Sequence, residues 1–572
     1  MSNRMNKKTN IVNSEKYRWM IMVVLSFIIC HLSFSPAGAQ SWVKKTRKST
    51  FVLKTFSADG TLLASAAGVF IGEKGEAISS FAPFKGASSA TVIDASGKQY
   101  AVDMLLGANE TYDVAKFRVG VKKSVPAVIS GVNAAVGDEV VLLSATGSTT
   151  GTIRKTETFG SAGYAYYTAL LPLPEGGVGL PLFNAGGQLI GLMQQPLNAA
   201  DTLNYAVSAV FADSLRIGGL SINDAAMRST KIRKALPDDV GQALLTLYIA
   251  PSALDSAECG QLIDDFIQKF PAEQDGYITR AQIEAGSDHY ADADADMQKA
   301  LTVGTKQDET HYSYSKLIYQ KVVYRPEPPY EPWTLDKALS EAQAAYDASP
   351  QPIYRQQQAY VLFAQKRYAD ASDVYATLFD SPLRSPDLFV EASTCRLALA
   401  DTTAYLALLD SAVSLFSKPY LKEASPYILT RAQARIEAGR YRDAVTDLND
   451  YEQLMRTQVN DNFYYLRFQA EQNGRIYQPA LNDIATAIRM NPRQEVYYAE
   501  KASLEVRVGL YDDAIATSRQ LIGMVPDYSD GHLFLGLALC LKGDKAAGVK
   551  SLLRAKELGD AQADGLIEKY GK

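Results

Sequence analysis

Residues 438–444 read AGRYRDA, and the same pattern recurs three more times before the end of the chain. Each copy has a glycine in a turn, usually a tyrosine near it, and then a small residue within a second helix. The small residues are spaced by 36, 34 and 34 positions, which indicates a tandem repeat. The other copies are NGRIYQPA (473–480), VGLYDDA (508–514) and KGDKAAG (542–548), and the small residues are Ala444, Ala480, Ala514 and Gly548.

The pattern predicts stacked helical hairpins. Only a small side chain fits where two helices of a hairpin cross closely, and the glycine is expected to take the positive φ that ends the first helix. Pro479 falls near a helix start, where its missing N–H costs little. Because one hairpin cannot bury its apolar face alone, the hairpins must stack. The 34-residue period resembles the tetratricopeptide repeats; the alternative is an unrelated helical array.

Weaker copies of the pattern lie earlier in the chain. Residues 290–293 and 368–371 repeat the tyrosine three positions before an alanine, and Ala338 indicates another second helix. A degenerate copy falls near Tyr405, and a possible half-unit lies near Cys259. We therefore predict an all-α solenoid of about eight repeats over residues 241–572.

A proline-rich segment, PEPPYEPW at 326–333, interrupts the repeats and stretches one spacing to 45. Prolines at this density exclude a helix, so we expect an extended loop between helices. The loop is either a connection or a functional element.

The first helices of such hairpins line a concave face that binds ligands. This face is polar and aromatic without a dominant charge, and the alternative is an ordinary solvated surface. Counting from the small residues places on it Gln356, Tyr360, Gln433, Tyr465, Gln469, Gln472, Asn473, Ser503 and Arg507.

Residues 45–219 read differently, because short strand-like runs alternate with glycine and Ser/Asp turns. Examples are FVLKTF at 51–56, VVLL at 140–143 and GQLIGL at 187–192. Many short strands at regular spacing predict an all-β sandwich or barrel.

The order of these pieces resembles the trypsin-like peptidases, specifically the HtrA (DegP-like) branch. The resemblance implies two six-stranded barrels with a cleft between them, and no PDZ-like segment follows. It rests on GVFI at 68–71, LLGANETYDVA at 105–115, VGDEVVL at 136–142, GGVGLPLFNAGGQLIG at 176–191 and NYAVS at 204–208.

Residue-by-residue matching to that family removes the catalytic machinery. Ala82 falls where the family has its histidine, Val178 falls where it has the nucleophilic serine, and Asp113 alone is retained. The four histidines of the chain are His31, His289, His311 and His532, so residues 40–280 contain no base of that kind. A serine nucleophile needs such a base, and the aspartate matters only by orienting it. We predict an inactive domain, a pseudopeptidase; the alternative is an active serine endopeptidase of this type.

The first 39 residues have the pattern of a signal peptide. Five basic residues precede the apolar run 19–29, and Ala37-Gly38-Ala39 matches a small-x-small cleavage site before Gln40. A membrane anchor is the alternative, but the run is short for a span of about 20 residues. We expect an exported protein, periplasmic or extracellular, with no stable membrane span after cleavage. Residues 220–240 are the expected linker between the two parts.

Composition narrows the function further. The net charge is -5 and the pI about 5.7, which argues against nucleic acid as a partner. After cleavage Cys259, Cys395 and Cys540 remain, too far apart for a disulfide framework, so we expect buried thiols. No metal or cofactor motif occurs.

The prediction is a noncatalytic scaffold that binds protein or peptide through the array, and also by strand addition in the inactive cleft. A barrel that merely caps the array is a further alternative.

Overall fold

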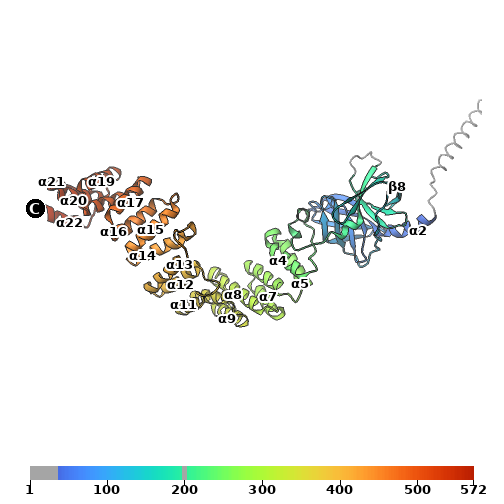
Figure 1. The fold of residues 1–572 in the computed structure, drawn as a ribbon, viewed down its shortest axis with the longest axis horizontal. Coiled ribbons are helices and arrows are strands. Elements are labelled where there is room, and N and C mark those ends of the chain that lie inside the picture. Colours follow the sequence, from blue (N-terminus) through green and yellow to red (C-terminus); the bar gives the residue numbers. More distant parts are fainter. Residues whose placement is uncertain (1–36, 196–202, 572) are drawn as a thin grey trace, which may run out of the picture. The chain divides into compact units, whose positions relative to one another are not determined.

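A computed structural model describes residues 37–195 and 203–571 of the chain. It divides into two compact units, with the division between Ala281 and Gln282. The strands, drawn in blue to teal in Figure 1, belong to the first unit, and the second is all helical. Each unit is considered by itself below.

Twelve strands of the first unit form two closed antiparallel barrels of six strands each. The strand order is β1-β2-β3-β6-β5-β4 in the first barrel and β10-β11-β12-β9-β8-β7 in the second. The two six-stranded barrels predicted for residues 45–219 are therefore confirmed. Their strands are β1 (Thr50–Phe56), β2 (Leu62–Phe70), β3 (Glu76–Ser79), β4 (Ser89–Asp94), β5 (Gln99–Asn109), β6 (Val114–Val119), β7 (Glu139–Leu143), β8 (Ser148–Phe159), β9 (Tyr164–Leu170), β10 (Pro181–Asn184), β11 (Leu189–Met193) and β12 (Leu203–Ser208).

In strands such as β9, alternate residues are buried in the barrel core, as the period of two requires. In the first barrel Phe51 and Phe117 meet edge to face with ring centroids 6.1 Å apart, and Phe84 lies 5.2 Å from Phe117. In the second barrel, Tyr167 and Leu182 belong to the buried core. These rings and aliphatic chains form the two barrel cores.

The segment predicted as a linker, 220–240, packs against the first barrel. The backbone carbonyl of Arg233 accepts the N–H of Leu105 at 2.8 Å, and the N–H of Ala235 donates to the carbonyl of Leu105 at 2.8 Å. Met227 and Ile232 are buried in the core of the first barrel. Backbone pairing and apolar burial together fix the connecting segment to β5. It contains the short helices η4 (Ser221–Asn223) and α3 (Ala225–Arg228).

Antiparallel helices follow in pairs, as the repeat predicted. Ala444, Ala480 and Ala514 are fully buried where their helices cross. A Cβ at Gly548 would lie 2.3 Å from Sγ of Cys540, so this crossing excludes any side chain. The helices are α4 (Val240–Ala253), α5 (Ser256–Lys269), α6 (Gln274–Gly286), α7 (Tyr290–Val303), α8 (Gln307–Tyr324), α9 (Leu335–Ala348), α10 (Pro352–Ala364), α11 (Tyr368–Ala376), α12 (Pro386–Ala398), α13 (Thr402–Ser414), α14 (Ser425–Glu437), α15 (Tyr441–Met455), α16 (Asp461–Asn473), α17 (Tyr477–Met490), α18 (Glu495–Arg507), α19 (Tyr511–Met524), α20 (Ser529–Lys542), α21 (Lys545–Glu557) and α22 (Ala563–Tyr570).

One turn departs from the prediction that glycine supplies the positive φ. Gly439, Gly509 and Gly543 do so, with φ of 71°, 82° and 109°. Gly474 instead has φ of -75°, and Arg475 takes the left-handed conformation with φ of 60°. This copy is one residue longer between its glycine and its small residue, so the left-handed position moves to the residue after the glycine.

The proline-rich segment 326–333 is a non-helical loop between α8 and α9, as predicted. Its far end is fixed by Trp333, which is buried and donates from Nε1 to Asp294 Oδ1 at 2.6 Å. At the near end Lys321 donates to the carbonyls of Arg325 and Pro326 at 2.7 and 2.8 Å. The loop therefore presents exposed prolines between two buried anchors.

The thiols of Cys259, Cys395 and Cys540 are free and buried, as expected. Among residues 37–195 and 203–571, no helix has the length and apolar character needed to cross a membrane. The predicted signal peptide lies outside the described residues except for 37–39, which begin α2 (Ala37–Thr46).

Candidate functional site

The structure brings together two of the three positions that the sequence matched to the family's triad, Ala82 and Asp113. Ala82 opens the short 3₁₀ helix η2 (Ala82–Phe84) just after β3, and Asp113 lies in the turn between β5 and β6 with φ of 49°. Oδ1 of Asp113 accepts the backbone N–H of Ala82 at 2.6 Å. The carboxylate thus hydrogen-bonds a turn, and the side chain at its partner position is an exposed methyl group that cannot accept a proton.

The third position, Val178, lies against the first barrel. Its carbonyl accepts the N–H of Ala67 at 3.0 Å. The next residue, Gly179, has φ of 79°, and a Cβ there would lie 2.2 Å from the carbonyl oxygen of Ala67. Glycine is therefore required for the loop to approach β2, while the half-buried isopropyl group of Val178 offers no nucleophile.

The hydroxyl of Ser79, which lies close to this loop, already donates a hydrogen bond to the backbone. Ser79 is fully buried, and its Oγ donates to the carbonyl of Ala67 at 2.5 Å. A nucleophilic serine instead needs its hydroxyl proton directed to a base. Within residues 37–195 and 203–571, no group of three histidine, cysteine or carboxylate side chains is placed to hold a metal ion.

Solved structures of known proteins are similar to about a third of this chain. No model of a known protein family matches the sequence, and no curated protein matches it. Among solved structures, a serine endoprotease from Yersinia pestis is similar, with 17% identity and a TM-score of 0.28, over 34% of this chain and 68% of that chain. The Rv3671c protease from M. tuberculosis, in its active form, has 18% identity and a TM-score of 0.29, over 36% of this chain and 92% of that one. The fold described above rests on the strand order of the two barrels.

The nine residues predicted for the binding face all lie on first helices of hairpins and form small groups. Gln433, Asn473 and Arg507 are exposed, and the other six are half-buried. Gln356 Nε2 and the Tyr360 hydroxyl donate to the two carboxylate oxygens of Glu391, at 3.0 and 2.8 Å.

A second group surrounds Tyr465. Its ring centroid lies 5.0 Å from that of Tyr497 and 5.9 Å from that of Phe468. Burial raises the pKa of Tyr465, and the nearby carboxylate of Glu500 adds to the shift. The remaining predicted residues lie on first helices outside these two aromatic groups. They are Gln472, Ser503 and the three exposed residues.

Sequence counting missed two members of the first group. Tyr319 on α8 lies 6.5 Å from Tyr360 between ring centroids, and Glu391 on α12 accepts both hydrogen bonds. Counting backwards from Ala338 by the repeat spacing fails to reach Tyr319, because the loop at 326–333 adds residues. Tyr319 could be predicted on the binding face only if these inserted residues were left out of the count. The copy near Tyr405 has no clear small-residue position from which to count.

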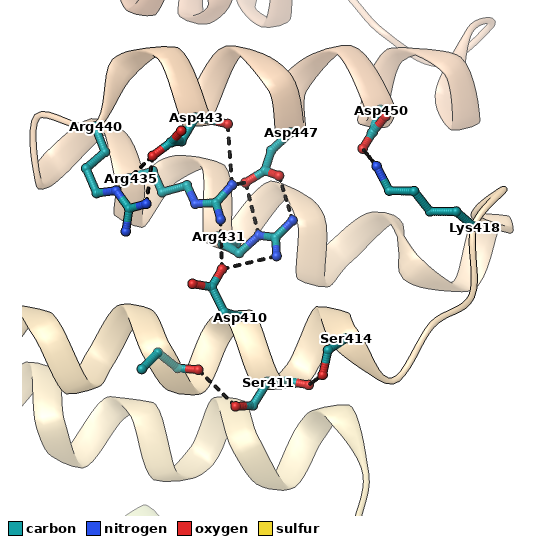
Figure 2. Close-up of polar contacts among 11 residues, drawn as sticks. Asp410, Ser411, Ser414, Lys418, Arg431, Arg435, Arg440, Asp443, Asp447 and Asp450 are labelled. Atoms are coloured by element: carbon teal, nitrogen blue, oxygen red, sulfur yellow. Dashed lines mark hydrogen bonds and ion pairs between the residues drawn. The ribbon is translucent and has the colours of Figure 1, made fainter.

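Counting also missed buried charges between the helices. Figure 2 shows Arg431 and Arg435 on α14 reaching Asp447 on α15 and Asp410 on α13. Both arginine side chains are 12% exposed, and Asp447 is 2% exposed. A signal was present: Arg431 recurs as Arg467 36 residues later, the spacing that separates Ala444 from Ala480.

Proposed function

We propose that this protein is a noncatalytic scaffold that binds proteins through its helical array. The observation that carries the proposal is the contact between Asp113 and Ala82, because it puts a backbone N–H and a methyl group where a serine peptidase needs an imidazole. Val178 removes the nucleophile as well. Loss of one of these groups would weaken catalysis, whereas loss of both leaves no acyl-transfer route through this position.

The array is the second part of the proposal, and we assign its hairpins to the tetratricopeptide type. The spacings of 36, 34 and 34 residues and the buried small residues at the helix crossings support this assignment. Stacked hairpins of this kind offer an extended face lined by first helices. The groups around Glu391 and Tyr465 supply aromatic rings and fixed polar atoms, which interfaces use as anchors. Export through the signal peptide belongs to the same proposal, as does capture of an extended peptide by strand addition at the barrels.

Two experiments test the proposal separately. The first treats the purified full chain with a fluorophosphonate probe, which labels activated serines, beside an active trypsin as positive control. We expect labelling of the trypsin and none of this protein. Covalent labelling of this chain would overturn the noncatalytic assignment and favour the serine endopeptidase.

The second experiment maps the binding face by photo-crosslinking in the native host. A crosslinking side chain is placed at Gln433, Asn473 or Arg507, which are exposed on first helices. Matched controls carry it at Asn482 or Ala485, which are exposed on the second helix α17. We expect one partner to be recovered from the first three positions and not from the controls. Equal recovery from both sets would contradict binding through the predicted face.

A further inference from the structure

A groove of about 970 Å³ lies on the outside of the first barrel, within the first unit. Its floor is the outer face of β5 and β6, with Met104 and Leu106 from one strand and Lys116 and Arg118 from the other. The connecting segment and α5 form the other walls. The outer face of a barrel is usually open to water, and here these added elements turn it into a concave surface of the size that binds ligands.

Every carboxylate that lines the groove has a role. Asp265 receives two hydrogen bonds from Arg233, and Asp238 pairs with Lys269 at 2.7 Å. Asp239 caps α4 by accepting the N–H of Gln242 at 2.9 Å. The remaining carboxylate, Glu76, lies 3.9 Å from the guanidinium of Arg118, at the limit of an ion pair.

Three cations in the groove lack a close carboxylate. Arg118 has this distant contact and a through-space interaction with Asp238, which already pairs with Lys269, and the Nε of Arg118 is buried without a hydrogen-bond partner. Lys116 Nζ donates to the carbonyl of Ala212 at 3.3 Å, and Arg216 Nε donates to the carbonyl of Asp213 at 3.3 Å. Positive charge held by long contacts to neutral groups is poorly compensated, because a carboxylate forms shorter and stronger hydrogen bonds with Lys and Arg.

The apolar residues that line the groove indicate which class of anionic ligand fits it. Leu215, Ile217 and Leu236 join Met104 and Leu106 around the cations. A ligand that matches both features carries carboxylates and apolar groups along an extended chain. A nucleic acid fits less well, because its closely spaced phosphates would face the four carboxylates of the groove.

We infer that this groove binds an acidic peptide segment whose carboxylates pair with Lys116, Arg118 and Arg216 while its apolar side chains cover Met104 and Leu106. This site lies in the first unit and does not depend on the array face. Failure of either proposal therefore leaves the other standing.

The test measures fluorescence anisotropy of a labelled heptapeptide of alternating Glu and Leu on the full chain after signal removal. The same peptide with Gln for Glu is the neutral probe. We expect saturable binding of the acidic peptide and about tenfold weaker binding of the neutral one, since each of the three ion pairs to a partly exposed cation contributes about two- to threefold. K116Q together with R118Q should weaken binding of the acidic peptide about fivefold, the product of two such ion pairs.

A matched control makes the same change in charge elsewhere on the domain. Lys122 and Lys123 are exposed and do not line the groove, so K122Q with K123Q should leave the affinity unchanged. R216Q is a second test that does not disturb folding, because Arg216 is exposed and donates only at long distance to a backbone carbonyl. It should weaken binding about two- to threefold, in line with one such ion pair.

Three results would overturn the inference. Absence of saturable binding by the acidic peptide excludes the site. Equal weakening by the groove variants and the control pair means general charge attraction. Displacement of the peptide by a single-stranded oligonucleotide at comparable concentration would assign the groove to nucleic acid instead.

Discussion

The hairpins α14–α15 and α16–α17 share a polar contact at the same position but differ one helical turn later. Arg431 binds Asp447 through two hydrogen bonds of 3.1 and 2.7 Å, and Arg467 binds Asp483 through two of 2.6 and 3.0 Å. Four residues further along the first helix, one hairpin has an arginine and the next has a glutamate.

The arginine at that position completes a network. Arg435 donates to Asp447 and to Asp410, both at 2.7 Å, so two cations face two carboxylates (Figure 2). Paired charges of this kind are tolerated in a hairpin core because each satisfies the other.

The glutamate has no such partner. Glu471 is 3% exposed, and its Oε2 is buried without a hydrogen-bond partner. Burial raises its pKa to about 8, with further contributions from the carboxylates of Asp483 and Glu452 and an opposing one from Arg467. The difference teaches that this helix position accommodates either an arginine paired with carboxylates or a glutamate without a cation, and that the glutamate is tolerated because it stays protonated and neutral at pH 7.

Among the variants that test this comparison, removal of Asp447 should cause the largest loss of stability. Asp447→Ala leaves Arg431 and Arg435 buried with only Asp410 between them, which costs about 3–5 kcal/mol in local stability. Hydrogen exchange of the α14 and α15 amides in the full chain measures the loss. Asp443→Asn is the control, because the side chain of Asp443 is about half exposed and pairs with Arg440, while the backbone carbonyl that accepts from Arg435 is kept; its change should stay within about 0.5 kcal/mol. Equal protection in the two variants would show that the network contributes no stability.

Glu471→Gln should stabilise α16–α17 in a pH-dependent way. The folded pKa of about 8 lies above the unfolded value of about 4.3. The protonated carboxyl therefore contributes stability that is fully present below about pH 4.3 and is lost as pH rises through 8. Glutamine carries no proton to lose, so the gain should grow through this window to about 2–4 kcal/mol at pH 8.5.

The measurement is hydrogen exchange of the α16 and α17 amides from pH 5 to 8.5, corrected for the intrinsic exchange rate. Glu437→Gln serves as the control, since Glu437 is exposed on α14. A gain that is the same at every pH would mean that Glu471 does not titrate in this range, and the proposed difference between the hairpins would fail.

Asp483→Asn should cost less than the loss of Asp447. Arg467 keeps Glu452 at 2.6 Å and Asn449 at 3.0 Å, and Glu471 loses one of the carboxylates that raise its pKa. We expect about 1.5–3 kcal/mol, the range for a hydrogen bond to a charged group. In the double variant with Glu471→Gln the two effects should not add, because the residues interact. Additive changes in hydrogen exchange would show that Glu471 is independent of Asp483.

The sequence predicted those features that leave a local pattern. Short strand-like runs at regular spacing predicted an all-β sandwich or barrel, the resemblance implied the two six-stranded barrels, and the small residues at fixed spacing predicted the hairpins. The resemblance alone suggested that Asp113 and Ala82 lie close together. The structure shows that they do, with a hydrogen bond of 2.6 Å between them. The non-helical loop at 326–333 followed from its prolines.

Features made by long-range contacts left no such pattern. The pairing of residue 105 with the connecting segment joins parts of the chain far apart in sequence. The left-handed turn at Arg475 depends on one inserted residue rather than on residue type. Buried charges such as Arg431 were not predicted, because a period search weighs small and apolar residues, although the recurrence of Arg431 as Arg467 at the repeat spacing could have revealed them.

Substitution of Asp410 should have the smallest effect on stability. It tests whether burial or the number of charge contacts sets the contribution of a carboxylate. Asp410 contacts the same two arginines as Asp447, at 3.2 and 2.7 Å, but its side chain is 42% exposed. Water replaces a lost partner at an exposed position, so Asp410→Asn should cost about 0.2–1 kcal/mol, and less at high salt. Hydrogen exchange of α13 and α14 at 0.05 and 0.5 M salt measures both values. A cost as large as that of Asp447→Ala would mean that the number of arginine contacts, and not burial, sets the contribution of each carboxylate.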